Sequence, residues 1–294
     1  MLGGIEAGGT KMVCVVGCDP DHLLSQTSIP TTTPSETLSS IIAFFRDSQQ
    51  HFEPLQAIGI AAFGPIDVNP LSADYGKIGL TPKRAWQGFN WVQALQEAFG
   101  LPVYVDTDVN GAALGEWKWG AAQNLDTFLY LTVGTGIGGG GMTHGNLLHG
   151  RFHPEMGHIR IPHDWQRDPF PGCCPYHGNC LEGLASGEAL YQRWGQKAQF
   201  LPADHPAWEL EAEYLALSLT NFIFTLSPQR ILLGGGVMKH PGLLENIRQK
   251  TLHYCAGYLP YLADEIETLI TIPQLGDLAG SCGALALAAS GCGR

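Results

Sequence analysis

Positive charge is scarce in this sequence of 294 residues. Sixteen Lys and Arg residues stand against 27 Asp and Glu residues, so the formal net charge at pH 7 is −11. A general nucleic-acid-binding protein needs a basic face that neutralises phosphates, and the composition argues against that class of partner. Small phosphorylated ligands are still allowed, because backbone amides can bind phosphate without net positive charge.

Long hydrophobic runs are also missing. No stretch approaches the about 18 apolar residues that a transmembrane helix needs, and the best run, 222–233, is interrupted by Pro228 and polar neighbours. The first residues contain Glu6 and lack the basic region of a secretory signal. We therefore expect no membrane partner and a cytoplasmic location. Hydrophobic residues are 45% of the chain, which favours a folded core over disorder.

The order of the expected elements predicts an α/β fold class. Thr33 and Glu36 have the spacing of a capping box around Pro34, and they predict the start of a helix. Its apolar face comprises Leu38, Ile41, Ile42 and Phe45. Further helices are expected at 91–99, 108–119, 181–194, 207–226 and 278–289, and strands at 2–5, 12–16, 57–62, 102–105, 128–133 and 230–233. Strand–glycine–strand units near both 2–16 and 128–142 suggest a duplicated architecture.

Three glycine-rich turns follow strand ends: Gly8-Gly9-Thr10-Lys11, a second turn over 134–140, and Gly234-Gly235-Gly236. Without side chains, successive backbone amides of such turns can converge on one anion. Each turn alone could simply join two strands, but three of them in an acidic chain favour a nucleotide site. A strand follows the first turn, whereas a helix follows the turn of a P-loop or a dinucleotide fingerprint.

Two acids lie where a strand is expected to end and a helix to begin. In extended chain, Asp106 and Asp108 would point to the same side. A carboxylate there could accept a proton from a substrate hydroxyl that attacks a phosphoryl group. The alternative is that Asp108 or Asn110 only caps the helix.

Three of the eight cysteines are clustered, with Cys173 and Cys174 close to Cys180. The spacing C-x-x-H-x-x-C over Cys174, His177 and Cys180, with His158 upstream, suits a closed tetrahedral zinc site. Cys173 is a possible competitor for Cys174, and the alternative is a group of unrelated thiols. The other cysteines, Cys14, Cys18, Cys255, Cys282 and Cys292, are expected to be buried or free thiols.

Two carboxylates flank this cluster. Glu155 precedes His158 by three residues, and Glu182 follows Cys180 by two. Fixed beside a rigid metal loop, they could accept hydrogen bonds from the hydroxyl groups of a polyol or sugar. Alternatively, each is a solvated surface residue.

Together these residues resemble the ROK family of sugar kinases, and in particular its bacterial fructokinase branch. The matching segments are Gly4–Lys11, Phe63–Asp67, Thr107–Glu116, Thr132–Gly138, His153–His158, Cys174–Glu182 and Gly234–Val237. The resemblance implies an actin-like ATPase fold of the hexokinase type, also called ribonuclease H-like, with two lobes around a cleft. The expected lobes are residues 1–118 with about 277–294, and residues 119–276.

The resemblance also implies a reaction and its site. The γ-phosphoryl group of ATP would be transferred to a hexose hydroxyl, with Asp108 as general base, Mg²⁺ on the nucleotide and Glu6 as a contact of that metal. The implied sugar-binding residues are Gly64, Pro65, Asn110, Glu155, His158 and Glu182. The implied nucleotide-binding residues are Gly8, Gly9, Thr10, Lys11, Thr132, Gly134, Thr135, Gly136, Gly187, Gly234, Gly235, Gly236 and Val237. A structural zinc on His158, Cys174, His177 and Cys180 and a homodimer complete the expectation.

Some positions depart from the common family pattern. Many members have Asp where this chain has Glu6, and C-x-C-x-x-x-x-C where it has C-x-x-H-x-x-C; both variants resemble the fructokinase branch. Gly111 replaces a more usual Ala. A broader kinase for mannose, glucose or N-acetylmannosamine remains open, as does a non-catalytic sugar-binding or regulatory protein. The repressors of this family carry a helix-turn-helix ahead of the kinase-like body, and a first phosphate loop that begins by residue 8 argues against that class.

Overall fold

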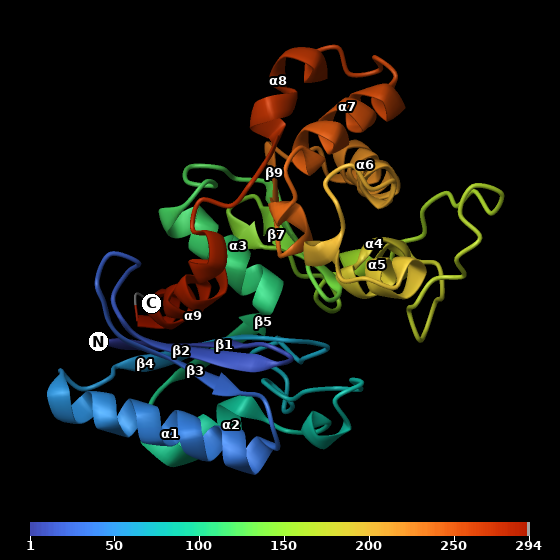
Figure 1. Cartoon of the computed structure of the whole chain (residues 1–294). Helices are drawn as coiled ribbons and strands as arrows, with labels where there is room; N and C mark the ends of the chain where they lie inside the picture. The colour runs from blue at the N-terminus through green and yellow to red at the C-terminus, as the bar shows by residue number, and fades with distance from the viewer. Residues whose placement is uncertain (293–294) are drawn as a thin grey trace. The chain divides into compact units, whose positions relative to one another are not determined.

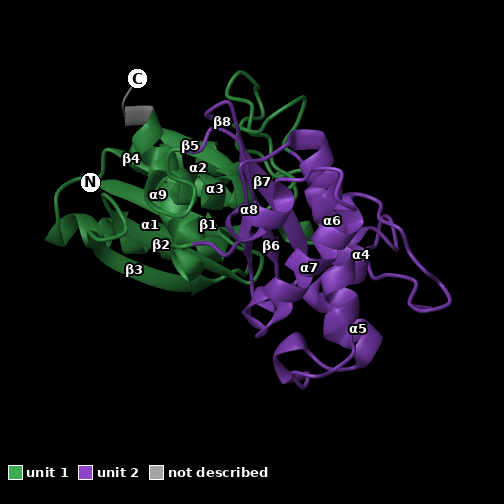
Figure 2. Ribbon diagram, turned by 90° about the horizontal axis from the view of Figure 1, so that it is seen from above, with its two compact units in different colours: residues 1–124, 147–153, 274–294 green, residues 125–146, 154–273 purple. Residues whose placement is uncertain are grey.

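The computed structural model describes residues 1–292 of the chain, which divides into two compact units (Figure 2). Unit 1 comprises Met1–Asn124, Leu147–His153 and the segment from Gln274 onward, and unit 2 comprises Leu125–Asn146 and Pro154–Pro273. Gly293, Arg294 and the side chain of Cys292 lie outside the described part. Within residues 1–292, every helix is too short or too polar to span a bilayer, and the described cysteines form no disulfide.

Unit 1 contains a five-stranded mixed sheet in the order β3-β2-β1-β4-β5. The strands are β1 (Leu2–Ala7), β2 (Lys11–Gly17), β3 (Leu23–Pro30), β4 (Ala57–Ala62) and β5 (Val103–Thr107). The predicted opening hairpin is confirmed, because β1 and β2 are antiparallel. Strand β3 was not predicted, since it is an edge strand with polar, partly exposed residues and has no apolar run.

Helices cover both faces of this sheet (Figure 1). One face carries α1 (Pro34–His51) and α2 (Trp91–Phe99), and the other carries α3 (Asp108–Trp119) and α9 (Ala279–Cys292). The capping box of α1 is confirmed, with Thr33 and Glu36 bonded reciprocally. The small residues of α9 bring its backbone against the sheet: a Cβ on Gly59 of β4 would lie 1.9 Å from the Ala284 carbonyl oxygen.

Unit 2 contains the second five-stranded sheet, in the order β10-β9-β6-β7-β8. Its strands are β6 (Phe128–Val133), β7 (Ile137–Thr143), β8 (Asn146–Leu147), β9 (Arg230–Gly234) and β10 (Ile270–Thr271). The second strand–glycine–strand unit is confirmed, with β6 and β7 antiparallel. The expected turn over 134–140 is too long, however, because Gly138, Gly139 and Gly140 pair with β6 as part of β7.

The helices of unit 2 are α4 (Leu181–Ala185), α5 (Gly187–Trp194), α6 (Ala207–Leu226), α7 (Leu243–Cys255) and α8 (Leu262–Leu269). The single helix expected over 181–194 is wrong, because Ser186 has extended backbone and its hydroxyl caps α5 at the Ala189 amide. Helices α7 and α8 were not predicted. Short 3₁₀ turns lie at Arg84–Trp86, Met156–His158, Ala198–Phe200, Val237–Lys239 and Gly276–Leu278.

A buried carboxylate ties α3 to the segment that leads into α9. Glu116 has no exposed surface, and its carboxylate accepts hydrogen bonds from the backbone amides of Ala121, Gln274 and Leu275 at 2.7–3.0 Å. Such a fully satisfied carboxylate is stabilising only while all of its donors remain paired.

Replacing Glu116 with Leu is therefore expected to lower the free energy of unfolding by about 3–5 kcal/mol, because three backbone amides lose their acceptor at once. Chemical denaturation of the two proteins measures the difference. The control is Glu97→Leu, at an exposed position of α2, for which a change within about 0.5 kcal/mol is expected. Equal effects of the two substitutions would contradict this role of Glu116.

Candidate active site and metal centre

The carboxyl ends of three parallel strands place the predicted motifs of unit 1 at one edge of the sheet. In the ladders, Ala7 pairs with Ala62 and Ala62 with Thr107. The Gly8 turn, the loop that begins at Phe63 and the start of α3 therefore follow adjacent strand ends. Ligand sites of α/β sheets lie characteristically at such edges.

The first glycine turn is held by a hydrogen bond within the turn and by bonds to Thr31, just after β3. The Gly8 amide donates to the Lys11 carbonyl oxygen at 3.1 Å, and the Thr31 hydroxyl donates to the Gly8 carbonyl oxygen at 2.8 Å. Thr10 and Lys11 are exposed. The turn thus has a fixed backbone and leaves a hydroxyl and an ammonium group accessible to a ligand.

Glu6 lies close to the predicted base. Its carboxylate fits against α9 because residue 280 is Gly, where a Cβ would lie 2.4 Å from the Glu6 carboxyl carbon. Burial, then the negative charges of Asp108 and Asp277, raises the pKa of Glu6 to about 7, although Lys11 acts in the opposite direction. Two carboxylates this close repel one another, and a bound cation would relieve that repulsion.

The raised pKa of Glu6 predicts a pH-dependent stability. Protonated Glu6 favours the folded state, so its contribution is fully present below about pH 4.5 and is lost as the pH rises through about 7. A pKa raised from 4.5 to about 7 corresponds to about 3 kcal/mol. Without Mg²⁺ and nucleotide, Glu6→Gln should lose less stability than the parent protein between pH 5 and 8 in denaturant titrations. Parallel pH profiles of the two proteins would contradict the raised pKa.

Asp108 is the first residue of α3. The cap of this helix is Thr107, whose hydroxyl oxygen accepts from the Asn110 amide at 3.1 Å, so neither Asp108 nor Asn110 is the N-cap. The alternation argument for Asp106 and Asp108 is wrong, because the chain is already helical at Asp108. The Asp108 carboxylate accepts from the Val109 amide at 2.9 Å and is partly exposed.

Asp106 and Asn110 are both buried and bonded to one another. The Asn110 Nδ2 atom donates to Asp106 Oδ1 at 2.9 Å, and Asp106 Oδ2 lies 2.9 Å from His149 Nε2. This hydrogen bond raises the pKa of His149. No sequence pattern pointed to His149, which is distant from Asp106 along the chain.

The predicted loop at Gly64 and Pro65 has a second histidine beside it. The peptide bond between these residues is cis. His153 is 6% exposed, and its Nε2 atom accepts from the Ile66 amide at 3.4 Å. The structure thus adds His153 to the surroundings of this loop, again without a sequence signal.

In unit 2, the structure brings the other predicted phosphate and adenosine motifs together. Thr132 pairs with Gly234 across the parallel strands β6 and β9. The Gly187 amide, at the start of α5, donates to the Gly134 carbonyl oxygen at 2.7 Å. Val237 is buried in the 3₁₀ turn that follows Gly236. Segments far apart in sequence therefore form one glycine-lined surface at the carboxyl ends of two strands.

Glu182 reaches the same glycine turn. Its Oε2 atom accepts from the Ile137 amide at 3.0 Å, and a Cβ on Gly136 would lie 2.5 Å from that oxygen. Glu182 lies on α4, whose N-cap is Cys180. The predicted metal loop and the second glycine turn are thus joined through one carboxylate.

The predicted metal ligands form one cluster. Ligand atoms of His158, Cys174, His177 and Cys180 lie within 4.8 Å of one another. His158 Nδ1 lies 3.8 Å from the Cys174 sulfur and 3.6 Å from the Cys180 sulfur, and His177 Nδ1 lies 3.7 Å from the Cys174 sulfur. Tetrahedral zinc with bonds of about 2.0–2.3 Å separates its ligand atoms by about 3.4–3.8 Å. The donor set and its spacing fit such a metal.

The other ring nitrogen of His158 faces a carboxylate. His158 Nε2 lies 4.0 Å from Glu155 Oε2, while Nδ1 faces the sulfur atoms. This separation is too long for a direct hydrogen bond, so the two polar groups face one another without being bonded. Glu155 therefore lies beside the cluster of metal ligands, next to His158.

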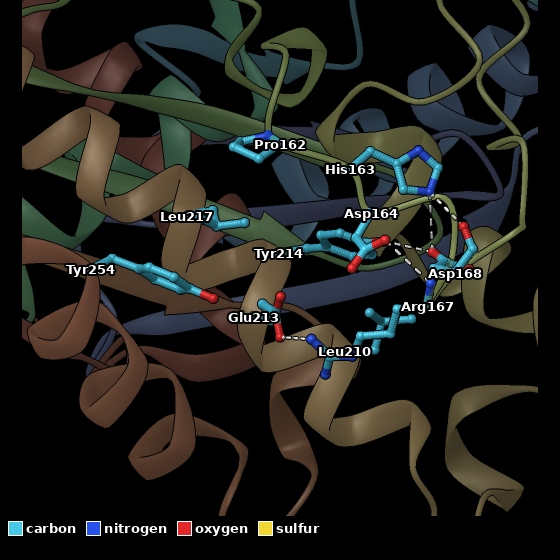
Figure 3. Close-up of a pocket in the computed structure, with 10 residues that line it drawn as sticks. All are labelled: Pro162, His163, Asp164, Arg167, Asp168, Leu210, Glu213, Tyr214, Leu217 and Tyr254. Carbon is cyan, nitrogen blue, oxygen red and sulfur yellow. Dashed lines mark hydrogen bonds and ion pairs between the residues drawn. The ribbon is translucent and has the colours of Figure 1, made fainter.

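A further polar cluster, which sequence reasoning missed, borders a pocket of about 320 Å³ in unit 2 (Figure 3). Asp168 is 3% exposed and accepts two hydrogen bonds from Arg193 at 3.1 Å and one from the Tyr214 hydroxyl at 2.6 Å. Burial, then the bond to Asp168, raises the pKa of Tyr214. His163 Nε2 lies 2.9 Å from the Asp168 carbonyl oxygen, and His163 Nδ1 lies 3.2 Å from Asn179 Nδ2. These contacts fix the loop between His158 and Cys174 to α5 and α6.

Comparison with known proteins assigns the family. Residues 2–290 match the ROK family. The chain belongs to this family. It is 46% identical to a putative fructokinase of Bacillus subtilis, covering 98% of this chain and 95% of that protein. It is 45% identical to a fructokinase of Zymomonas mobilis, covering 98% and 96%.

The fold of the family agrees with the structure. A ROK family glucokinase from Streptomyces griseus, solved in complex with glucose and AMPPNP, superimposes with a TM-score of 0.78 at 26% identity and covers 98% of this chain and 99% of that one. The expected actin-like ATPase fold, of α/β class, is confirmed.

Proposed function

We propose that this ROK protein is an ATP-dependent fructokinase that converts fructose to fructose 6-phosphate. The observation that carries the proposal is the position of Asp108, partly exposed at the first residue of α3 and close to Glu6. The identity of 45–46% to proteins named as fructokinases supports fructose as the hexose. Intact phosphate motifs favour a catalyst over a regulatory member of the family.

In the proposed reaction, Asp108 accepts the proton of the 6-hydroxyl group as its oxygen attacks the γ-phosphorus. The bond to the bridging oxygen of ADP breaks, and ADP leaves. The amides and hydroxyls of Gly8–Lys11 and Thr132–Gly136, with Gly187, are proposed to bind the phosphates, and Gly234–Val237 the adenosine.

Mg²⁺, when bound with ATP, offsets the charge of the phosphates. Glu6 is the carboxylate that we propose as its protein contact, directly or through water. The raised pKa of Glu6 fits this assignment, since a cation would replace the proton that the metal-free site favours.

We propose that His158, Cys174, His177 and Cys180 bind a structural Zn²⁺. With four protein ligands and no open position, the ion would supply rigidity and would not bind substrate. Through His158 it would fix the turn that follows Glu155, whose carbonyl oxygen accepts from the His158 amide at 3.0 Å, and through Cys180 the start of α4 with Glu182. These carboxylates, His158, Asn110 and the Gly64-Pro65 loop are the proposed sugar contacts.

The proposal is tested by identifying the product. Incubation with fructose, ATP and Mg²⁺ should yield fructose 6-phosphate, detected by a coupled isomerase and dehydrogenase assay. Fructose 1-phosphate, which this coupled assay does not detect but ³¹P NMR resolves, would contradict the assigned hydroxyl.

We also propose that the protein is a cytoplasmic homodimer. Size-exclusion chromatography with light scattering tests the oligomeric state.

A further inference from the structure

The segment Leu147–His153 packs as part of unit 1, although its neighbours on both sides belong to unit 2. Its two histidines contact two different motifs of the proposed sugar site. His153 accepts from the Ile66 amide, immediately after Gly64 and Pro65. His149 lies against Asp106 and Asn110, at the end of β5 and the start of α3.

The contacts of Asp106 define what His149 does. Asp106 is 3% exposed, and its Oδ1 atom accepts from the Thr107 amide at 2.8 Å and from Asn110 Nδ2 at 2.9 Å. Its Oδ2 atom is bonded to His149 Nε2 at 2.9 Å. A carboxylate only accepts hydrogen bonds, so His149 Nε2 is a donor to Asp106, as Asn110 Nδ2 is, and the two nitrogen atoms lie 3.2 Å apart beside it.

This arrangement makes the orientation of Asn110 depend on His149. A buried carboxylate that loses one of its donors must turn, take up water or find another partner, because leaving it unpaired is costly. Any such movement of Asp106 displaces the Asn110 amide that is bonded to it. Asn110 and Asp108 lie on the same first turn of α3.

We propose that His149 is a positioning residue of the sugar site, which acts through Asp106 to fix the Asn110 amide for a sugar hydroxyl group. The inference rests on the proposed hexose kinase function, and it assigns His149 no contact with the reacting atoms. It predicts an effect on sugar binding that is larger than the effect on ATP binding.

The test compares His149→Leu, which removes the donor, with His149→Gln, whose Nε2 can donate to Asp106. His149→Leu should raise the KM for fructose by about tenfold or more, as expected for loss of a hydrogen bond to a charged group, and leave the KM for ATP within about twofold. His149→Gln should recover most of the loss. The matched control is His22→Leu, which breaks an exposed Asp19–His22 pair of 2.8 Å in the same unit and should change neither constant.

A second variant keeps the test decisive if His149→Leu does not fold. Asp106→Asn should raise the KM for fructose in the same way, because it removes the charged acceptor of the same contact. A folded His149→Leu or Asp106→Asn protein with an unchanged KM for fructose would overturn the inference. An equal rise in the KM for fructose and the KM for ATP, accompanied by a lower melting temperature, would also overturn it, because that result indicates general damage to the fold. If the parent protein phosphorylates no hexose, the proposed function itself fails. That result is distinguishable from failure of the inference on His149, which requires an active parent protein.

Discussion

Replacing Asp108 with Asn is expected to lower kcat by about 10²- to 10⁴-fold, the contribution of a general base. The amide has nearly the shape of the carboxylate but cannot accept the hydroxyl proton. Its oxygen can still accept from the Val109 amide, as the Asp108 carboxylate does at 2.9 Å, so α3 should remain intact. Steady-state kinetics with fructose and ATP measure the loss.

Two controls separate chemistry from folding in that experiment. The melting temperature and the metal content of Asp108→Asn should match those of the parent protein, because the cluster of metal ligands contains no atom of Asp108. The KM values should change much less than kcat, since the base acts mainly in the transition state. Turnover within about threefold of the parent would remove Asp108 as the base.

Loss of the metal cluster is expected to have the largest effect on stability. The purified protein should contain one zinc ion per chain, and Cys180→Ser should contain almost none. Because structural zinc contributes several kcal/mol to folding, the melting temperature should fall by about 10 °C or more. Cys180→Ser protein that remains folded should also show a higher KM for fructose, since the helix that carries Glu182 begins directly after this ligand.

Cys173 provides the matched control for the zinc experiment. Its sulfur lies 3.9 Å from the Ser186 hydroxyl oxygen and is outside the cluster of ligand atoms. Cys173→Ser should therefore keep its metal and its melting temperature. Metal loss in Cys173→Ser with retention in Cys174→Ser would reverse the ligand assignment, and an absence of zinc in the parent protein would refute the zinc site.

Local signals in the sequence predicted local structure well. The capping box at Thr33 has the expected form, and α2 has the predicted bounds of 91–99, ending at Gly100 with a φ of 66°. These signals succeed because the hydrogen bonds concerned join residues within one turn of a helix. Strand β3 and the break at Ser186 depend instead on edge position and on a single side-chain cap, which periodicity does not register.

In the candidate site, too, local features were predictable from the sequence and long-range contacts were not. The cluster of metal ligands was predictable, because three of its four ligands lie within one turn and have a characteristic spacing. The contacts of Asp106 with His149, and of Asp168 with Arg193 and Tyr214, join distant segments and became visible only in the folded chain. The assignments of individual residues to sugar and nucleotide stay predictions until they are tested by substitution.

The most direct test of the account is a comparison of kcat/KM for fructose, mannose, glucose and N-acetylmannosamine, with ATP and Mg²⁺ and zinc-loaded protein. The account predicts a kcat/KM for fructose at least about tenfold above the others, which corresponds to about 1.4 kcal/mol of selectivity in the transition state. Comparable values for several sugars would keep the kinase and contradict the assignment of fructose. No turnover with any of them, by folded protein that binds ATP, would contradict the account as a whole.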